Sequence, residues 1–370
     1  MAFTLSGLDV HYLVREFRPL LLDAFLDKAY QGVGKRDVML RMRSPRHGKQ
    51  QLFFRVPDAL FLTGHRFPWP THPPGFCMQL RKRLGNAQLS DIRQVGFERV
   101  VELVFRRGEE SWRLVVELFS KGNVILVDGD GVIRGVLDRQ RWKGRSLQPS
   151  EEYLPPPQTA DPRGLSFEEF SRMWGGAGRE LVRFCAASLG LGGKYAEEVV
   201  ARVGLDKFAT SLDDGQLRSL YEAVMGLFER SLEPVVSGGD AAPFPLVTWP
   251  GAESRESFSG AVEEVVVAEK VEAAEEVAEK EARKVTDRYD RIIDQQGKKL
   301  EGYRRAAADN QRRGELIYER YRELSSLLEK VRSLQEEGGW DAVKEYAEEH
   351  GLPIKVNEKD GVISFEIQES

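Results

Sequence analysis

The chain has 370 residues, more than one hydrophobic core usually serves, so two or three domains are expected. Cys77 and Cys185 are far apart and form no CxxC pair, and the five histidines follow no metal-ligand spacing, so neither a disulfide framework nor a metal site is predicted. Because neither a signal-peptide pattern nor a run of about eighteen apolar residues occurs, we expect a cytoplasmic protein without a membrane span.

The formal net charge of -5 is unevenly distributed along the chain. Seven basic residues between Lys35 and Arg55 accompany a single acidic residue, Asp37, whereas glutamate predominates from about residue 252 to residue 350. A basic front is typical of a protein with an anionic partner. Ordinary solubilising charge explains the composition equally well, so the charge alone does not decide between them.

The N-terminal residues predict a helix with a defined start. Ser6 is the expected N-cap, and Asp9 is placed to complete a capping box in the position usually taken by Glu. Pro19 is expected to kink or end this helix. Alternating apolar residues then predict short strands at 25–30, 38–42, 51–56 and 60–63.

A loop rich in proline leads into a second predicted helix, residues 76–84. Arg81, Lys82 and Arg83 lie in its last turn, where cations either stabilise the negative end of the helix dipole or bind phosphate. Both interpretations stay open. Further strands are predicted at 89–95, 100–106, 112–119, 123–127 and 132–136, with a hairpin turn at 128–131.

Glu98 and Arg99 stand side by side between two of these strands. Neighbouring residues in a strand point to opposite faces, so both can serve one site only if a bulge or turn at Gly96 redirects them. A pair of solvated surface charges is an equally good interpretation. The pattern therefore leaves the role of this acid and base open.

A proline-rich stretch at 153–162 predicts a domain boundary, and helices are expected beyond it. The first begins at Ser166. A second is capped within residues 211–214 and reaches about residue 232, after which residues 238–249 are expected to be extended.

Residues 189–199 between these helices carry the pattern of a helix-hairpin-helix motif. Gly190 and Gly192 flank an apolar residue, and Gly193 and Lys194 open the second helix. Exposed amide groups in such a hairpin can hold a backbone phosphate, although the same hairpin often serves only as a packing corner. Tyr195 replaces the Ser or Thr that a P-loop requires, so a P-loop is excluded.

From about residue 258 to residue 310 the sequence predicts one long helix, about 75 Å at 1.5 Å per residue. Its apolar seam follows the spacing of a coiled coil and includes Ala278, Ala282, Val285, Tyr289, Ile292, Leu300, Tyr303 and Ala307, with Gln296 as a weak point. No second heptad helix follows, so the seam is expected to self-associate or to fray. Shorter helices at 314–333 and 340–349 and strands at 353–356 and 362–367 complete the prediction.

Six stretches together resemble the NFACT family of ribosome-associated quality-control factors, called NEMF in animals and RqcH in bacteria and often labelled fibronectin-binding protein A-like. They occur in the order of the family and cover nearly the whole chain. They are Leu5-Ser-Gly-Leu-Asp9, residues 76–84, Gln94-Val-Gly-Phe-Glu-Arg99, residues 117–126, residues 189–194 and Gly314-Glu-Leu-Ile-Tyr318.

The resemblance implies an α+β fold in four parts. Residues 1–160 would form an NFACT-N domain, similar to the N-terminal domain of formamidopyrimidine-type DNA glycosylases, and residues 161–255 a helix-hairpin-helix domain with an extended linker. Residues 256–310 would form a first coiled-coil helix, and residues 311–370 a middle domain at its tip. The family continues through a second coiled-coil helix and an NFACT-R domain, so the resemblance also implies an N-terminal fragment.

Members of this family bind large ribosomal subunits obstructed by peptidyl-tRNA and recruit tRNA for untemplated C-terminal tailing, with alanine in bacteria and archaea. The resemblance implies tRNA as a partner, together with rRNA and stalk-base proteins of the large subunit, which would contact the coiled coil and tip domain. No cofactor is implied. The ribosome performs the peptidyl transfer, so the chain is not expected to be an enzyme.

The functional acid of the family corresponds to Asp9, and its Asp-Arg pair to Glu98 and Arg99, where Glu replaces Asp. Asp9 is thus expected to be a helix-capping carboxylate, a functional acid near the pair, or both. Further predicted RNA contacts are Arg81, Lys82, Arg83 and Lys121, with Gly190, Gly192, Gly193 and Lys194 in the helix-hairpin-helix motif.

Two other functions are alternatives. The glycosylase-like domain and the hairpin motif suggest a nucleic-acid repair enzyme. Those enzymes use an N-terminal Pro-Glu as nucleophile and acid, whereas Ala2-Phe3 stands there in this chain. The common label of the family suggests a fibronectin-binding surface adhesin, which the missing export signal disfavours.

Overall fold

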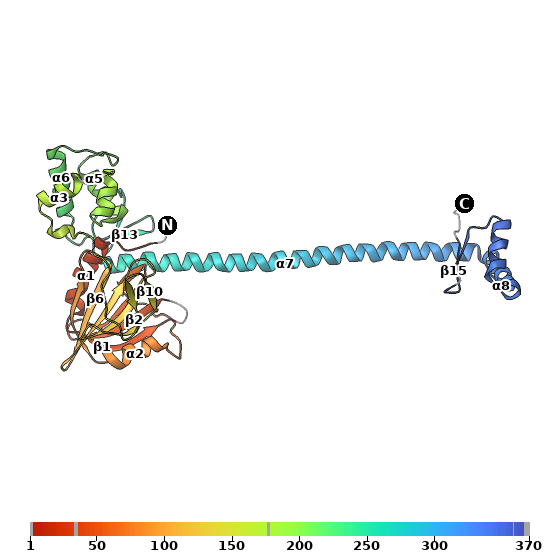
Figure 1. The fold of residues 1–370 in the computed structure, drawn as a ribbon, viewed down its shortest axis with the longest axis horizontal. Coiled ribbons are helices and arrows are strands. Elements are labelled where there is room, and N and C mark those ends of the chain that lie inside the picture. Colours follow the sequence, from red (N-terminus) through yellow and green to blue (C-terminus); the bar gives the residue numbers. More distant parts are fainter. Residues whose placement is uncertain (1–2, 33–35, 176–177, 358, 366–370) are drawn as a thin grey trace. The chain divides into compact units, whose positions relative to one another are not determined.

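A computed structural model describes residues 3–32, 36–175, 178–357 and 359–365, without the side chains of residues 269–288 and 365. The chain divides into two compact units, Met1–Glu275 and Glu276–Ser370, and Figure 1 shows the elements of each. The predicted α+β fold class is confirmed. Within the described residues, no helix combines the length and the apolar character needed to cross a bilayer.

A nine-stranded antiparallel sheet forms the centre of the first unit (Figure 1). The strand order β4-β3-β2-β1-β5-β6-β7-β8-β9 consists of two meanders that join where β1 pairs with β5. The predicted strands match the observed ones to within three residues at each end. The observed strands are β1 (Phe25–Gln31), β2 (Asp37–Ser44), β3 (Gly48–Arg55), β4 (Ala59–Leu62), β5 (Gln88–Gln94), β6 (Val100–Arg107), β7 (Glu110–Glu117), β8 (Asn123–Asp128) and β9 (Ile133–Val136).

Helix α1 (Gly7–Leu21) begins at the predicted capping box. The Ser6 N–H donates to Asp9 Oδ2 at 2.8 Å, and the Asp9 N–H donates to Ser6 Oγ at 3.1 Å. The helix continues two residues past Pro19 and does not end there. Proline lacks only its own N–H, and the next turn still closes because Leu22 donates to the Arg18 carbonyl. Helix α2 (Gly75–Leu84) ends at Gly85, as predicted.

The helical region of the first unit packs on the same hydrophobic core as the sheet. The last helix of this region starts within the predicted capping stretch 211–214, with Asp213 as the N-cap, but it stops at Gly226 and not at about residue 232. The Asp213 carboxylate completes a capping box with Gln216, which fixes the start. The elements are η1 (Pro162–Gly164), α3 (Phe167–Gly175), α4 (Leu181–Arg183), η2 (Phe184–Ser188), α5 (Gly192–Arg202), α6 (Asp214–Gly226), β12 (Val235–Ser237), β13 (Asp240–Ala242) and β14 (Glu253–Ser254).

Helix α7 (Phe258–Glu319) starts on the first unit. The Glu16 carboxylate accepts the N–H groups of Phe258 at 3.0 Å and of Ser259, and so caps the positive end of the helix. The helix runs nine residues past its predicted end at residue 310. Gly314, which is half-buried, does not stop it, because a glycine costs a helix only about 1 kcal/mol relative to alanine.

In the second unit, α8 (Tyr321–Glu349) is interrupted at Gly339, and β15 (Ile354–Asn357) pairs with β16 (Val362–Phe365). Residues 366–367 of the predicted last strand lie outside the described residues. Of the predicted seam of α7, Tyr289, Ile292, Leu300 and Tyr303 are exposed. The side chains of Ala278, Ala282 and Val285 lie outside the described part.

Candidate functional site

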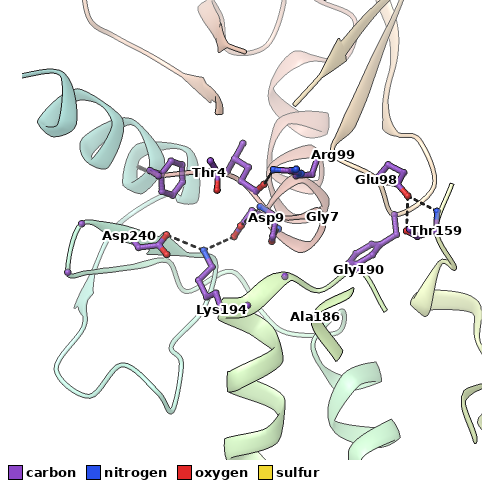
Figure 2. Close-up of a pocket in the computed structure, with 18 residues that line it drawn as sticks. Thr4, Gly7, Asp9, Glu98, Arg99, Thr159, Ala186, Gly190, Lys194 and Asp240 are labelled. Carbon is purple, nitrogen blue, oxygen red and sulfur yellow. Dashed lines mark hydrogen bonds and ion pairs between the residues drawn. The ribbon is translucent and has the colours of Figure 1, made fainter. Parts of the chain in front are cut away.

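A polar cavity of about 750 Å³ lies where the sheet meets the helical region of the first unit (Figure 2). Its wall comes from segments far apart in the sequence: the residues that enter α1, the β5–β6 connection, Thr159, the loop before α5 and the turn between β12 and β13. Seven residues predicted from the sequence line it. These are Asp9, Glu98, Arg99, Gly190, Gly192, Gly193 and Lys194.

Glu98 and Arg99 reach the cavity because the chain turns between β5 and β6. Gly96 has a φ of +57°, a left-handed conformation that favours glycine, and the Glu98 N–H donates to the Val95 carbonyl at 3.2 Å. The turn at Gly96 that the sequence analysis required for a shared site is present. Both side chains therefore line one cavity, although they are neighbours in sequence.

The acid and the base have different partners. Glu98 Oε1 accepts from both the N–H and the hydroxyl of Thr159 at 2.7 Å. Arg99 donates to the Leu5 carbonyl at 3.4 Å, and burial lowers the pKa of its guanidinium against the opposing effect of Glu98. No ion pair joins Glu98 to Arg99. Because a guanidinium carries several N–H donors, most of those on Arg99 remain available to a ligand.

Asp9 is fully buried and connects α1 to α5. One carboxylate oxygen caps α1 through Ser6, and the other accepts the Tyr195 hydroxyl and lies 3.3 Å from Lys194 Nζ. Burial and the Asp9 charge raise the pKa of Tyr195 well above its usual value. The predicted capping role is confirmed, and the charge partner of Asp9 is Lys194, not Arg99.

Lys194 is fixed in the wall by three oxygen atoms. Besides Asp9, its ammonium group contacts Asp240 Oδ1 at 3.2 Å (Figure 2). It also donates to the Ala241 carbonyl at 2.6 Å. Burial raises the pKa of Asp240, and Lys194 opposes that rise. The cavity therefore contains cations and carboxylates together, so it offers a ligand both donors and acceptors.

Two helices begin at this cavity. The predicted helix-hairpin-helix pattern is confirmed, since Gly190 and Gly192 have φ of +66° and +76° and α5 follows at once. The first N–H groups of a helix lack partners within it, and its positive end favours anions. A Cβ atom on Gly7, the first residue of α1, would lie 2.5 Å from the Phe97 carbonyl oxygen. Only glycine allows α1 to start so close to the turn at Gly96.

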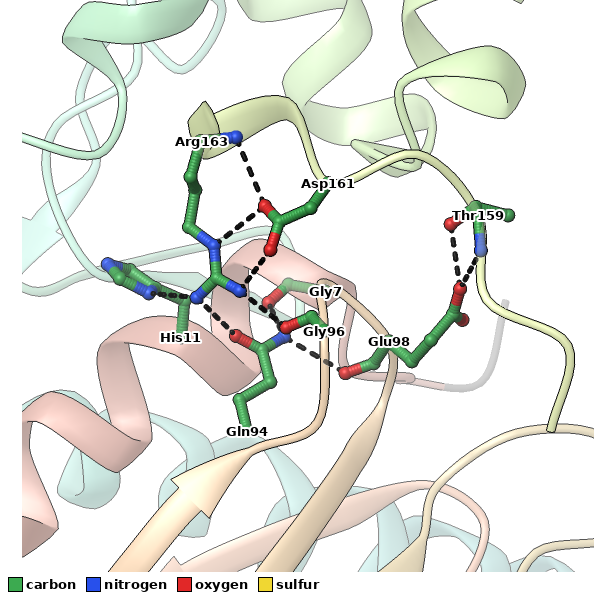
Figure 3. Close-up of polar contacts among 8 residues, drawn as sticks. All are labelled: Gly7, His11, Gln94, Gly96, Glu98, Thr159, Asp161 and Arg163. Atoms are coloured by element: carbon green, nitrogen blue, oxygen red, sulfur yellow. Dashed lines mark hydrogen bonds and ion pairs between the residues drawn. The ribbon is translucent and has the colours of Figure 1, made fainter. Parts of the chain in front are cut away.

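Arg163 supports this turn from the helical region (Figure 3). Its guanidinium donates to the Gly96 carbonyl at 2.5 Å and to Gln94 Oε1 at 3.4 Å, and Asp161 holds it in place. Gln94 in turn donates to the Gly7 carbonyl at 2.8 Å. The network thus fixes the start of α1 against the turn that presents Glu98 and Arg99.

Sequence reasoning missed four residues of this site: Thr159, Arg163, Tyr195 and Asp240. Asp161 and Pro162 were interpreted only as the end of a proline-rich boundary, and nothing in the sequence singled out the next residue, Arg163. Its pairing with a turn some seventy residues earlier left no signal in the sequence pattern. Tyr195 was considered only as a departure from the P-loop pattern.

The other predicted cations lie outside the cavity. Arg81 donates to the Ala29 carbonyl at 2.8 Å and stacks on Tyr30, and Arg83 lies over the Trp112 ring. Lys82 is exposed on α2, and Lys121 is exposed in the β7–β8 turn. Among the described residues, no group of three or more His, Cys, Asp or Glu side chains is placed to hold a metal ion.

The chain thus joins an antiparallel sheet domain to a helical region with a two-glycine hairpin, and a long helix follows. Residues 6–364 match the family described as NFACT N-terminal and middle domains, and the chain belongs to that family.

The archaeal Rqc2 homolog aRqcH of Methanocaldococcus jannaschii is 30% identical over the whole chain, which spans 59% of that protein. The Rqc2 homolog RqcH of Streptococcus pneumoniae is 30% identical over 42% of the chain and 30% of its own length. Human ribosome quality control complex subunit NEMF is 28% identical over 36% of the chain and 12% of its own length.

Two solved structures share the fold of about two thirds of the chain. The N-terminal region of the fibronectin/fibrinogen-binding protein from Streptococcus suis superposes with a TM-score of 0.59 at 23% identity, covering 70% of this chain and 97% of that one. The fibrinogen-binding protein from Staphylococcus aureus gives 0.58 at 20% identity, covering 69% and 96%. At these identities the likeness concerns the fold alone.

Proposed function

We propose that the chain is a ribosome-associated quality-control factor that binds tRNA on an obstructed large ribosomal subunit and supports untemplated alanine tailing of the stalled nascent chain. The observation that carries the proposal is the cavity, where the functional acid and the acid-base pair of the family meet the helix-hairpin-helix motif. The match to an archaeal Rqc2 homolog along the whole chain supports the cellular role.

The composition of the cavity favours a nucleotide as the group that enters it. A phosphate accepts hydrogen bonds, which Arg99 and the first amide groups of α5 can donate. The edge of an unpaired base both donates and accepts, and Glu98 and Asp240 are acceptors in the same wall. We therefore assign the cavity to an unpaired nucleotide of tRNA.

Asp9 and Lys194 act in this proposal as positioning residues. Asp9 is buried and holds the two helix starts together, so it shapes the cavity. The exposed Lys82 and Lys121 would contact phosphates at a distance from it, and Arg81 and Arg83 would add charge to that surface. Long helix α7 and the second unit would contact rRNA and stalk-base proteins of the large subunit.

The proposal assigns no covalent step and no cofactor to the chain. The ribosome would perform the peptidyl transfer, and the chain would hold tRNA in the cytoplasm for that reaction. Loss of the cavity contacts should therefore reduce tRNA affinity and tailing together.

The test measures tRNA binding by fluorescence anisotropy and tailing in the full-length protein. Arg99→Ala is expected to weaken tRNA binding about tenfold, because a charge-assisted contact to RNA contributes about 1–3 kcal/mol. Glu98→Asp, which restores the acid typical of the family, should retain binding. Arg172→Ala on α3 is the matched control, since it removes an exposed arginine outside the cavity. Unchanged tRNA recovery and tailing in Arg99→Ala and Glu98→Ala would refute the role.

Fibronectin binding is the second candidate, because the two solved relatives carry that name or the related fibrinogen name. Immobilised fibronectin retaining the purified chain, with cell fractionation locating it at the surface, would favour this candidate. A repair enzyme would instead cleave damaged duplex DNA, and the chain is expected to show no such activity.

A further inference from the structure

A second cavity, of about 450 Å³, lies between a small hairpin and the proline-rich segment of the first unit. The hairpin pairs β10 (Gln140–Trp142) with β11 (Arg145–Leu147). Aromatic and aliphatic side chains form most of the wall, including Phe119, Trp142, Leu154 and the prolines at 155–157. Trp142 is 43% exposed and Leu154 48%, so the cavity is open to a partner.

The Trp142 ring is held in place by its neighbours. Trp142 and Arg145 are paired across the hairpin, and the Arg145 guanidinium lies 5.7 Å from the Trp142 ring centroid and 5.6 Å from that of Tyr153. The buried Glu117 carboxylate pairs with Arg145 and accepts the Tyr153 hydroxyl at 3.0 Å. An exposed aromatic ring fixed in this way loses little conformational entropy when a flat ligand stacks on it.

Positive charge surrounds this exposed ring. Arg141 and Lys143 in the hairpin and Arg139 just before it are exposed. The neighbouring acid, Asp138, pairs with Arg36 at 2.9 Å. Gln140 Nε2 donates to the Gly122 carbonyl at 3.1 Å, which brings the turn carrying the exposed Lys121 beside the hairpin. Such a surface is complementary to a polyanion that also carries aromatic groups.

The second cavity adjoins the first along two stretches of backbone. Pro157 lines the second cavity and Thr159 lines the first, so at most about 7 Å of extended chain separates these two residues. The Leu118 N–H donates to the Arg99 carbonyl at 2.7 Å, and Phe119 follows in the wall of the second cavity. A flexible strand bound in the first cavity can therefore continue into the second.

We propose that the second cavity binds an unpaired base of RNA, stacked on Trp142, with the adjoining phosphates at Lys143 and Lys121. This inference rests on the proposed RNA-binding function and adds a second contact to it. Single-stranded nucleic acids are typically held by exposed aromatic rings within a basic surface, because every base presents a π-face. The weak dependence of stacking on base identity makes this a contact for strand position and not for sequence.

The experiment measures binding of the 370-residue chain to a fluorescein-labelled ten-nucleotide oligouridylate and to tRNA at several salt concentrations. Trp142→Ala is expected to weaken oligouridylate binding about fivefold or more, whereas Trp142→Phe, which keeps an aromatic ring, should lose less. Lys143→Glu should weaken binding and flatten its salt dependence. Arg172→Glu, with the same change of net charge, is the control.

The outcomes separate this inference from the proposed function. If Trp142→Ala binds the oligonucleotide as the wild type does, the inference is wrong, even when Arg99→Ala loses tRNA. If Trp142→Ala loses the oligonucleotide while the wild type shows no affinity for tRNA, the inference holds and the tRNA function fails. Binding of an oligoglutamate peptide through Trp142 without RNA binding would assign the cavity to a protein partner and overturn the proposal.

Discussion

At the scale of single residues, Asp9 joins the starts of two helices through one buried carboxylate. Its carboxylate caps α1, accepts the Tyr195 hydroxyl and lies beside the Lys194 ammonium group, all without exposure to solvent. A buried carboxylate that accepts this many hydrogen bonds contributes first of all to the stability of the fold. Its effect on function should therefore pass through the positions of Lys194 and of the two helix starts.

Asp9→Asn is expected to reduce the free energy of unfolding by about 3–5 kcal/mol, since it removes one partner of a buried ion pair and leaves Lys194 and Tyr195 facing an amide. Ser6→Ala removes only the cap and should cost about 1 kcal/mol. Urea unfolding followed by tryptophan fluorescence compares the two variants. Equal losses would mean that the pairing with α5 contributes nothing.

His11 should make the first unit sensitive to acid. Burial, followed by Arg163 and Arg15, lowers the pKa of His11 to about 4, whereas the unfolded chain titrates near 6.5. The unfolded state thus binds more protons between these values, so stability is complete above about pH 6.5 and decreases as the pH falls toward 4.

Because solvent reaches part of the ring, the expected loss attributable to His11 is about 1–2 kcal/mol. Unfolding curves at pH 7.5 and pH 4.5 measure it as the difference between the wild type and His11→Gln, which cannot titrate. The same pH dependence in both proteins would contradict this origin of the effect.

The residues of the site were predictable only where one short stretch carried the signal. Ser6 and Asp9 are three residues apart, and Gly96 precedes the pair that it redirects, so both features follow from local geometry. The Tyr195–Asp9 contact joins residues 186 positions apart and depends on how the helical region packs on the sheet. Sequence periodicity contains no information about such a distance.

At the scale of elements, two glycines near helix starts differ in what they tolerate: Gly7 at the start of α1 and Gly193, the second residue of α5. A Cβ atom on Gly7 would meet the Phe97 carbonyl at 2.5 Å, whereas one on Gly193 would have no atom within 4 Å. Gly7→Ala should therefore destabilise the fold by about 1–3 kcal/mol through overpacking. Gly193→Ala should leave stability unchanged or slightly improved, because alanine favours a helix over glycine.

Thermal unfolding measures both effects, and tRNA binding adds a second readout. The Gly193 methyl group would occupy the space that the proposed phosphate needs, so affinity should fall although the fold remains intact. Normal tRNA binding by a stable Gly193→Ala chain would exclude the first turn of α5 from the contact.

Strands and helices were predicted well where the apolar period was clear, as in β5 to β9, and less well at their ends. Within the predicted capping stretch 211–214, Asp213 is the N-cap because Gln216 stands three residues later and completes the box. The sequence predicts the end of the long helix at about residue 310 and a new helix from Gly314, yet helix-forming neighbours carry α7 through Gly314 to Glu319. The residue at which a helix or strand ends depends on small differences in free energy between neighbouring end positions, and the pattern of apolar residues does not resolve them.

At the scale of the whole molecule, the second unit exposes apolar side chains along α7. Tyr289, Ile292, Leu300 and Tyr303 lie at coiled-coil spacing, and Tyr303 is 72% exposed. An apolar seam of this kind gains free energy when another helix covers it, by about 25 cal/mol for each Å² removed from water. We therefore expect the 370-residue chain to self-associate through the seam as its concentration rises.

Sedimentation equilibrium should show a mass that increases with concentration, and Leu300→Lys should shift the chain toward the monomer by placing a charge in the seam. Glu301→Lys, an adjacent exposed position outside the seam, is the control and should associate as the wild type does. If the chain instead remains monomeric, the uncovered helix should fray, and hydrogen exchange over residues 289–307 should be fast. A monomer with strongly protected amides there would contradict both outcomes, because α7 would then be stable without a second helix covering its seam.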